Sequence, residues 1–333
     1  MSSKMNTRIP LIALCLLMAF GLTNCKDEAV EEPIVYNFDD EFKDITVEAV
    51  TETEPAAVES TEGDVTDSAT EDAAAAALAS GTATAEMTAA SDAMASIVSE
   101  DEATALSDAL ASGGTLSDEQ QANIDALLAT GSIDAFLPTT VLPTVNGQTV
   151  SARKATSPRE VVLLNLTEML LGVADECSDA AEASLATAKA TLDAAKASQD
   201  AIINGSYTTR ETAIGTVHTA SLAAITTKWA DKKTAAETKA ASMISSIEAN
   251  GLPSFFKLLV NIVLNKKLAS FSSSEAAAIK AADLVQQTAL TNAAAARDTD
   301  LATSTANYNT SLNSATAIAA SAAASCHNQG GSN

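Results

Sequence analysis

Residues 192–247 read LDAAKASQDAIINGSYTTRETAIGTVHTASLAAITTKWADKKTAAETKAASMISSI, and every eleventh residue counted from the first is apolar. The series also extends toward the N-terminus, and its members are Leu170, Ala181, Leu192, Ile203, Ile214, Ile225, Ala236 and Ile247. A second series with the same spacing consists of Leu268, Ile279, Leu290, Leu301, Leu312 and Ala323. An 11-residue repeat corresponds to about 3.67 residues per helical turn, so its members form one nearly straight apolar stripe. The sequence therefore predicts two long α-helices.

A turn signal separates the two series. Residues 250–253 read NGLP, and glycine just after a helix with proline soon after it is typical of a helix end and a new start. Folding the chain back at this point places each large residue of the second series level with a member of the first, for example Leu268 with Ala236. We therefore predict an all-α fold, a long antiparallel helical hairpin of the hendecad coiled-coil type over residues 159–326.

Two cysteines support the same register. Cys177 and Cys326 lie level with each other in this hairpin, and a disulfide is expected between them in an oxidising compartment. An alternative fold breaks the first helix at residues 204–206 (NGS), which would give a shorter bundle of three or four helices. Ile203 and Ile214 stay in phase across that site, which favours the unbroken helix.

Composition excludes several function classes. The chain has 333 residues, a formal net charge of −24, 3% aromatic residues and two histidines. Strong negative charge argues against a nucleic-acid partner, and the scarcity of aromatic residues argues against a β-sandwich or barrel. The sequence has no G-x-S-x-G, H-E-x-x-H or Gly-rich phosphate-binding motif. We expect neither an enzyme nor a bound cofactor or metal.

The N-terminus has the pattern of a secretion signal. Lys4 and Arg8 precede the apolar run IPLIALCLLMAFGL at residues 9–22, which is too short for a membrane span and is typical of a signal-peptide core. Leu22-Thr23-Asn24-Cys25 follows and resembles a bacterial lipobox. The resemblance implies a signal peptide over residues 1–24 and acyl chains such as palmitate on Cys25, which would anchor the chain in the outer membrane.

The next three residues suggest which side of that membrane is occupied. Lys26, Asp27 and Glu28 follow the cysteine, and this order resembles the export signal of surface-exposed lipoproteins of the Bacteroidetes. The resemblance implies a location on the cell surface, and the periplasmic face is the alternative.

Residues 25–72 are strongly acidic and show neither helical nor alternating periodicity. We expect this stretch to be a disordered tether, because its few large apolar groups are spaced singly and would not offset the entropy of ordering the chain. Asp67-Ser68-Ala69 resembles an O-glycosylation site of the same bacterial group, which would place a glycan on Ser68.

An Ala-rich helical segment is expected over residues 73–135. Ser117 and Gln120 form a capping-box pattern within it. Residues 136–158 contain three prolines and an Asn-Gly pair, which indicates a linker. The apolar residues 161–171 would pack with the 73–135 helices as a small helical base beyond the cysteines, and residues 327–333 would form a flexible tail.

The stretch LPSFFKLLVNIVL at residues 252–264 is too apolar for an exposed hairpin tip. It either forms a local cap on Met243, Ile244 and Ile247, or a dimer contact, or it remains exposed as a tip that binds a protein or a membrane. The residues that would form an exposed interacting tip are Phe255, Phe256, Leu259 and Ile262, with Lys257, Lys266 and Lys267 meeting lipid headgroups.

Three function classes fit these features. The first is a non-enzymatic, lipid-anchored envelope protein whose helical stalk has a structural, adhesive or protein-interaction role at the cell surface. The second is a periplasmic spacer or assembly accessory, similar in shape to the helical hairpins of efflux adaptor proteins. The third is a membrane-active helical protein that inserts its apolar tip. The partner is not identified by the sequence, and a homo-oligomer is compatible with each class.

Overall fold

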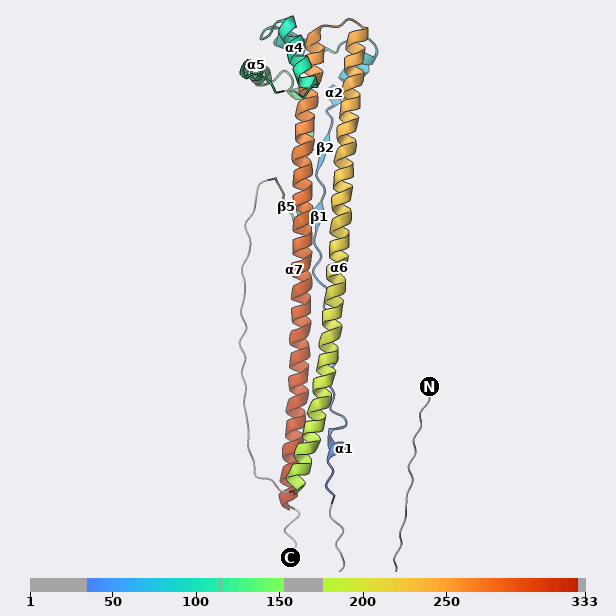
Figure 1. Cartoon of the computed structure of the whole chain (residues 1–333), viewed down its shortest axis with the longest axis vertical. Coiled ribbons are helices and arrows are strands. Elements are labelled where there is room, and N and C mark those ends of the chain that lie inside the picture. Colours follow the sequence, from blue (N-terminus) through green and yellow to red (C-terminus); the bar gives the residue numbers. More distant parts are fainter. Residues whose placement is uncertain (1–34, 114, 153–175, 329–333) are drawn as a thin grey trace, which may run out of the picture.

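The protein is an antiparallel helical hairpin with a small helical cap at its closed end (Figure 1). The computed structural model describes residues 35–113, 115–152 and 176–328. Helix α6 runs from Glu176–Ala249 and helix α7 from Ser254–Asn328, so the turn lies at the predicted residues 250–253. Helix α6 continues through residues 204–206 without a break. The predicted hairpin is confirmed over residues 176–326, while residues 159–175 of the prediction lie outside the described residues. The alternative bundle is wrong.

The hairpin has the predicted register. Cys177 and Cys326 form a disulfide with their Cα atoms 5.8 Å apart. Farther along, the Ser304 hydroxyl donates a hydrogen bond of 2.7 Å to the Asp200 carboxylate across the two helices. At 1.5 Å per residue, the 74 residues of α6 span about 110 Å. The molecule is therefore a narrow rod that is covalently closed at the end opposite the turn.

The two predicted apolar stripes are buried to different degrees. On α6, Leu192, Ile203 and Ile247 of the predicted series are buried. On α7, one buried row lies three residues beyond the predicted series and includes Phe271, Ala293, Ser304 and Ala315. Ile279 of the predicted series is 36% exposed. Most side chains of this row are small, and a third segment of chain packs against the hairpin.

That third segment is the N-terminal stretch expected to be a disordered tether, and the expectation is wrong for its described part. From residue 35 the chain follows the hairpin toward the turn, with a short helix α1 at Asp39–Phe42 and strands β1 at Ser60–Thr61 and β2 at Asp64–Thr66 (Figure 1). Phe42 packs on Leu192 and Ala315 near the disulfide. Val65 is 1% exposed and packs against Trp229 and Phe271. Widely spaced apolar residues are sufficient because each one fills a place in a groove that the hairpin provides.

Part of the predicted linker forms the strands that hold this segment. Strand β3, Thr139–Val141, pairs antiparallel with β2, while β4, Thr144–Val145, pairs with both β1 and β5, Gln148–Thr149. The loop between β4 and β5 contains Asn146 and Gly147, both at positive φ, as a tight two-residue hairpin requires. Val65 of β2 and Val145 of β4 are buried, so these short strands add small apolar clusters along the side of the rod.

Four short helices form the cap, which we define as residues 69–136. They are α2 Ala69–Ala79, α3 Ala85–Ala95, α4 Glu100–Ala111 and α5 Asp118–Ala129, followed by the 3-10 turn η1 Asp134–Phe136. Ser117 and Gln120 make the predicted capping box. The cap packs on the turn end of the hairpin, not beyond the cysteines as predicted. The proposed partner of these helices, residues 161–171, lies outside the described residues.

Candidate functional site

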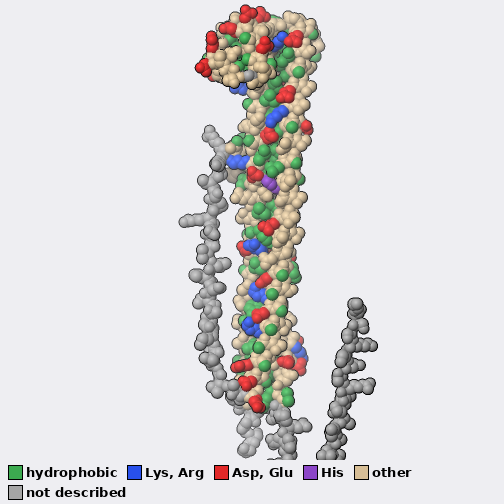
Figure 2. Space-filling model, viewed as in Figure 1, with side chains coloured by type: hydrophobic (Ala, Val, Ile, Leu, Met, Phe, Trp, Pro, Cys, Tyr) green, Lys and Arg blue, Asp and Glu red, His purple; other side chains and the backbone are tan. Residues whose placement is uncertain are grey.

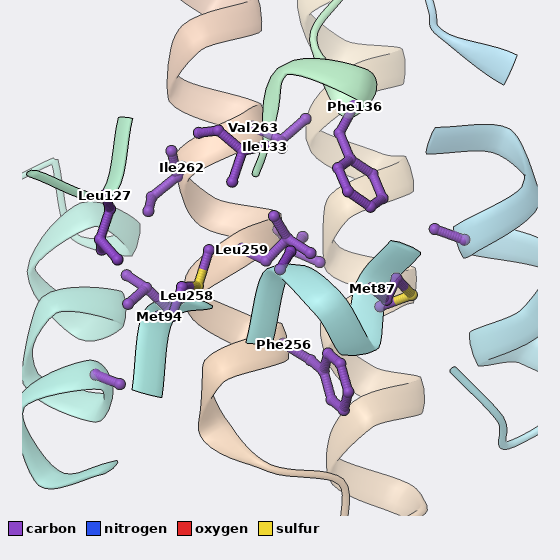
Figure 3. Close-up of a cluster of buried hydrophobic side chains, with 14 of the residues drawn as sticks. Met87, Met94, Leu127, Ile133, Phe136, Phe256, Leu258, Leu259, Ile262 and Val263 are labelled. Atoms are coloured by element: carbon purple, nitrogen blue, oxygen red, sulfur yellow. The ribbon is translucent and has the colours of Figure 1, made fainter. Parts of the chain in front are cut away.

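The apolar stretch at the start of α7 forms the centre of the cap core. Phe256 is 5% exposed, and Leu259 and Ile262 are each 2% exposed. Figure 3 shows their side chains surrounded by residues of the cap, including Met94 and Leu127. The prediction of an exposed, membrane-inserting tip is therefore wrong for these residues.

The prediction that this stretch packs locally on the end of α6 is confirmed. The structure adds a second covering surface, the cap, that the sequence did not show. Met243 and Ile247 at the end of α6 belong to the same core cluster, and Ile244 packs against it. The larger part of the covering surface comes from helices more than a hundred residues earlier in the chain. Phe255 is half-buried at the edge of this core.

The three lysines expected at the tip have separate environments. Lys257 makes an ion pair of 2.8 Å with Glu248 across the hairpin turn. Lys266 is exposed. Lys267 is 2% exposed and lies beneath the start of α2. The structure thus does not gather them into one basic rim.

Lys267 is the centre of a charge cluster that connects the cap to both long helices. Its Nζ donates hydrogen bonds of 3.0 Å to both carboxylate oxygens of Glu71, which is 6% exposed. It also lies 2.5 Å from an oxygen of Asp67. Lys239 of α6 contacts the same Asp67 and Glu71 and bonds to Asp72 at 2.6 Å. Two cations from the hairpin are therefore matched by three carboxylates around the N-terminus of α2, where negative charge is also favoured by the helix dipole.

The cluster makes the docking of the cap pH-dependent. Burial opposes ionisation of Asp67, but hydrogen bonds from Lys267 and Lys239 outweigh it and hold the pKa of this carboxyl below its ordinary value of 3.8. Its stabilising contribution is complete above pH 3.8 and is lost as the pH falls through the lowered pKa. We expect the protection factors of the α2 amides, which are corrected for the intrinsic exchange rate, to fall as the pH is lowered from 3.8 through the lowered pKa of Asp67. Asp67→Asn should flatten this pH dependence, and an equally steep profile in the variant would contradict the assignment.

A row of polar side chains on the hairpin holds the N-terminal segment along its length. Side chains of both long helices donate hydrogen bonds to backbone carbonyls of that segment. They are Ser311 to Thr46, Asn307 and Gln199 to Glu48, Asn292 to Ala56, Lys228 to Gly63, and Lys232 to Val65. An extended chain with no neighbouring strand over most of its length thereby finds partners for its backbone groups.

Asp300 makes the most buried of these contacts. Asp300 is 2% exposed. Its carboxylate accepts hydrogen bonds from the Thr53 amide N–H at 3.0 and 3.1 Å and from the Thr53 hydroxyl at 2.6 Å. The Asp300 side chain thus fixes the middle of the N-terminal segment to α7.

We expect Asp300→Ala to raise the amide exchange rate of Thr53 and its neighbours by about 10- to 100-fold, because a charge-assisted hydrogen bond contributes about 1.5–3 kcal/mol. Hydrogen-exchange mass spectrometry of the full chain measures this directly. Asp298→Ala is the matched control, since Asp298 is exposed and forms its ion pair with the adjacent Arg297. Unchanged exchange at Thr53 would show that the segment is held by its apolar contacts alone.

Sequence reasoning missed these contacts, although a signal was present. Residues 26–72 contain 17 acidic residues and two lysines, whereas 15 of the chain's 19 basic residues lie in residues 153–333. Residues 153–333 contain 15 basic and 16 acidic residues, so the excess of negative charge lies in the first half of the chain. The structure shows that part of it is paired across the two halves, for example Arg210 with Glu52 and Lys228 with Glu62.

The cap presents an acidic surface at the end of the rod. Residues 73–152 contain ten acidic and no basic residues. Figure 2 shows Asp and Glu side chains over the visible face of the cap and Lys and Arg mainly along the shaft. The remaining predicted sites are distributed elsewhere. The Ser68 hydroxyl accepts a hydrogen bond of 3.0 Å from the Glu71 amide as the N-cap of α2, and Cys25, Lys26, Asp27 and Glu28 lie outside the described residues.

The part of the chain that the structure describes offers no cluster of His, Cys, Asp or Glu suited to hold a metal ion. Within the same residues, none of the helices has a run apolar enough and long enough to span a bilayer. No protein-family model, curated protein or solved structure matches the chain.

Proposed function

We propose that the chain is a non-enzymatic, lipid-anchored protein of the cell surface, in which the hairpin holds the cap at a distance from the outer membrane. The observation that carries the proposal is that the N-terminal segment and the cap lie at opposite ends of the rod. The N-terminal segment joins the hairpin at the disulfide end, where Asp39 accepts a hydrogen bond of 2.7 Å from Ser184. The cap covers the turn at the opposite end (Figure 1).

The position of the proposed lipid site follows from this placement of the N-terminal segment at the disulfide end. Val35, where the described chain begins, is the tenth residue after Cys25. Ten residues reach at most about 35 Å even when fully extended. An acylated Cys25 therefore keeps the disulfide end near the bilayer, while the cap lies about 110 Å farther along the rod. This arrangement suits a stalk with an interacting end.

Two features of the structure support a stiff stalk. The disulfide between Cys177 and Cys326 prevents the two helices from separating at the membrane end. The N-terminal segment lies against both helices between that end and the cap, and it is held by hydrogen bonds from α6 and α7. A hairpin of two thin, Ala-rich helices gains a third packing element in this way.

The proposal is tested in cells that express the natural chain. Wild type should incorporate an alkyne analogue of palmitate and should be cleaved by protease added to intact cells, whereas Cys25→Ala should lose the label and be released from the membrane. A labelled wild type that protease reaches only after the outer membrane is opened would contradict surface exposure and favour a periplasmic spacer.

The export signal needs its own variant. Replacing Lys26, Asp27 and Glu28 together with alanine should retain the lipid label but remove protease accessibility in intact cells. A variant that remains fully accessible would show that these three residues do not direct the chain outward. Phe42→Ser, which disturbs the packing of the N-terminal segment but not the signal, serves as the control for altered folding.

A further inference from the structure

The N-terminal segment, residues 35–68, connects the proposed lipid site to the rest of the molecule. It follows Cys25 in the chain and leads into α2 of the cap, and the two long helices come after the cap. A force that pulls the cap or the hairpin away from an anchor at Cys25 must therefore pass through this segment. How the segment lies on the hairpin determines how that force is carried.

The segment runs along the hairpin in a nearly extended conformation (Figure 1). Near its start Asp39 bonds to Ser184, and near its end Asp67 pairs with Lys239. Between these two contacts α6 advances 55 residues, or about 80 Å, while the segment advances 28 residues. It covers about 2.9 Å per residue, whereas a fully extended chain covers about 3.3–3.6 Å. The segment can therefore lengthen by only about 10–20 Å before it pulls on α2.

Contacts with both long helices are spread along this path. Phe42 fills an apolar position near the start of the segment, and Val65 fills one near its end. Hydrogen bonds from the hairpin reach residues between and beside these two positions. They are accepted or donated by Thr46, Glu48, Thr53, Ala56, Gly63 and Val65. The segment is thus fixed at many points and not only at its ends.

The direction of a force determines how many of these contacts resist it at once. A force that pulls the anchor and the cap apart acts along the segment, so the contacts bear it together and must break almost simultaneously. A force that lifts the start of the segment sideways acts on the first contact alone, and the others then break one after another. Because a single hydrogen bond contributes little net stability, resistance to force depends on this sharing.

We infer that the N-terminal segment is a tension-bearing strap that holds the cap at the far end of the rod when the cap is pulled away from the membrane. The hairpin keeps the segment extended, and the segment keeps the disulfide end at the anchor. If the segment were released, the cap would become the point of attachment and the disulfide end would swing free. The inference rests on the proposed lipid anchor for the origin of the force.

The test pulls single molecules of residues 25–333 in optical tweezers, without acyl chains and with the native disulfide intact. One DNA handle is attached to the Cys25 thiol. The second is attached either to Ser245→Cys near the turn, for axial pulling, or to Ala317→Cys near the disulfide, for sideways pulling, and both positions are exposed. We expect the first release to need a severalfold higher force in the axial geometry. An axial force equal to or lower than the sideways force would overturn the inference.

The length change identifies the event in the sideways geometry. Release should lengthen the molecule by about 100 Å or more, because the freed segment alone reaches about 110 Å when extended. A first release with a much smaller gain would mean that the segment is not peeled from the hairpin, and this result would also overturn the inference.

A matched pair of variants tests whether the contacts share the force. Asp300→Ala removes the hydrogen bonds to Thr53 and should lower the axial release force. Asp298→Ala removes an exposed carboxylate of the same helix and should leave that force unchanged. Equal axial forces in both variants and wild type would contradict sharing. These measurements need no lipid, and the labelling and protease experiments need no force, so the strap and the lipid anchor can fail separately.

Discussion

Replacing Lys267 with methionine is expected to lower the free energy of unfolding of the cap by about 3–5 kcal/mol, because it leaves the buried Glu71 carboxylate without its main cation. Glu71 loses both of its hydrogen bonds to Nζ, and Asp67 loses its closest cation. Lys239 remains near both carboxylates and limits the loss. Hydrogen exchange of α2 and α3 amides, together with urea unfolding, measures the effect.

Two controls separate charge from packing in this experiment. Lys266→Met changes the exposed neighbouring lysine and should shift stability by about 0.5 kcal/mol or less. The double variant Lys267→Met/Glu71→Met replaces the buried pair by two apolar side chains and should recover most of the lost stability. A double variant that is less stable than Lys267→Met alone would contradict the account of an uncompensated carboxylate.

Removal of the disulfide is expected to produce the second large effect. Cys177 and Cys326 are 149 residues apart in sequence, and the chain-entropy model gives about 5 kcal/mol for closing a loop of that size. We expect Cys177→Ser/Cys326→Ser to lower the free energy of unfolding by about 3–5 kcal/mol. Urea unfolding of the variant beside the oxidised wild type measures the difference.

The location of the loss provides a further check. The open end of the hairpin should exchange its amides faster in the double variant, and α1 should follow because Phe42 packs there on Leu192 and Ala315. The cap lies at the other end of the rod and should be unaffected under conditions where the chain stays folded. Faster exchange in the cap rather than at the open end would contradict the assignment of the local effect of the disulfide to the open end of the hairpin.

Local signals explain why the hairpin was predictable. The 11-residue spacing on α6 coincides with buried positions such as Leu192 and Ile203, because a helix presents the same face at that interval in any context. Glycine and proline at the turn act on the backbone within a few residues. Cys177 and Cys326 are brought together by the register alone. Each of these features depends on residues that are close in sequence or on the pairing of α6 with α7.

The surface that covers residues 252–264 could not be predicted from the sequence. The sequence identified residues 252–264 as too apolar for water, but it did not show which surface covers them. Met87 and Phe136 lie in the same core (Figure 3), and the short helices that carry them have no strong apolar face of their own to indicate a partner. The assignment of Phe256 to a core instead of a membrane required the position of the cap.

The sequence alone determined two long helices, their turn, their register and their disulfide, because each follows from periodicity or from backbone preferences within a short stretch of chain. Only the tertiary structure decided that residues 35–68 line the hairpin, that the cap lies on the turn, and that Lys267 is buried with Glu71. Those outcomes depend on grooves and charges that exist only after the helices have paired. An extended acidic segment has no periodicity of its own, and its conformation is fixed by the surface on which it packs.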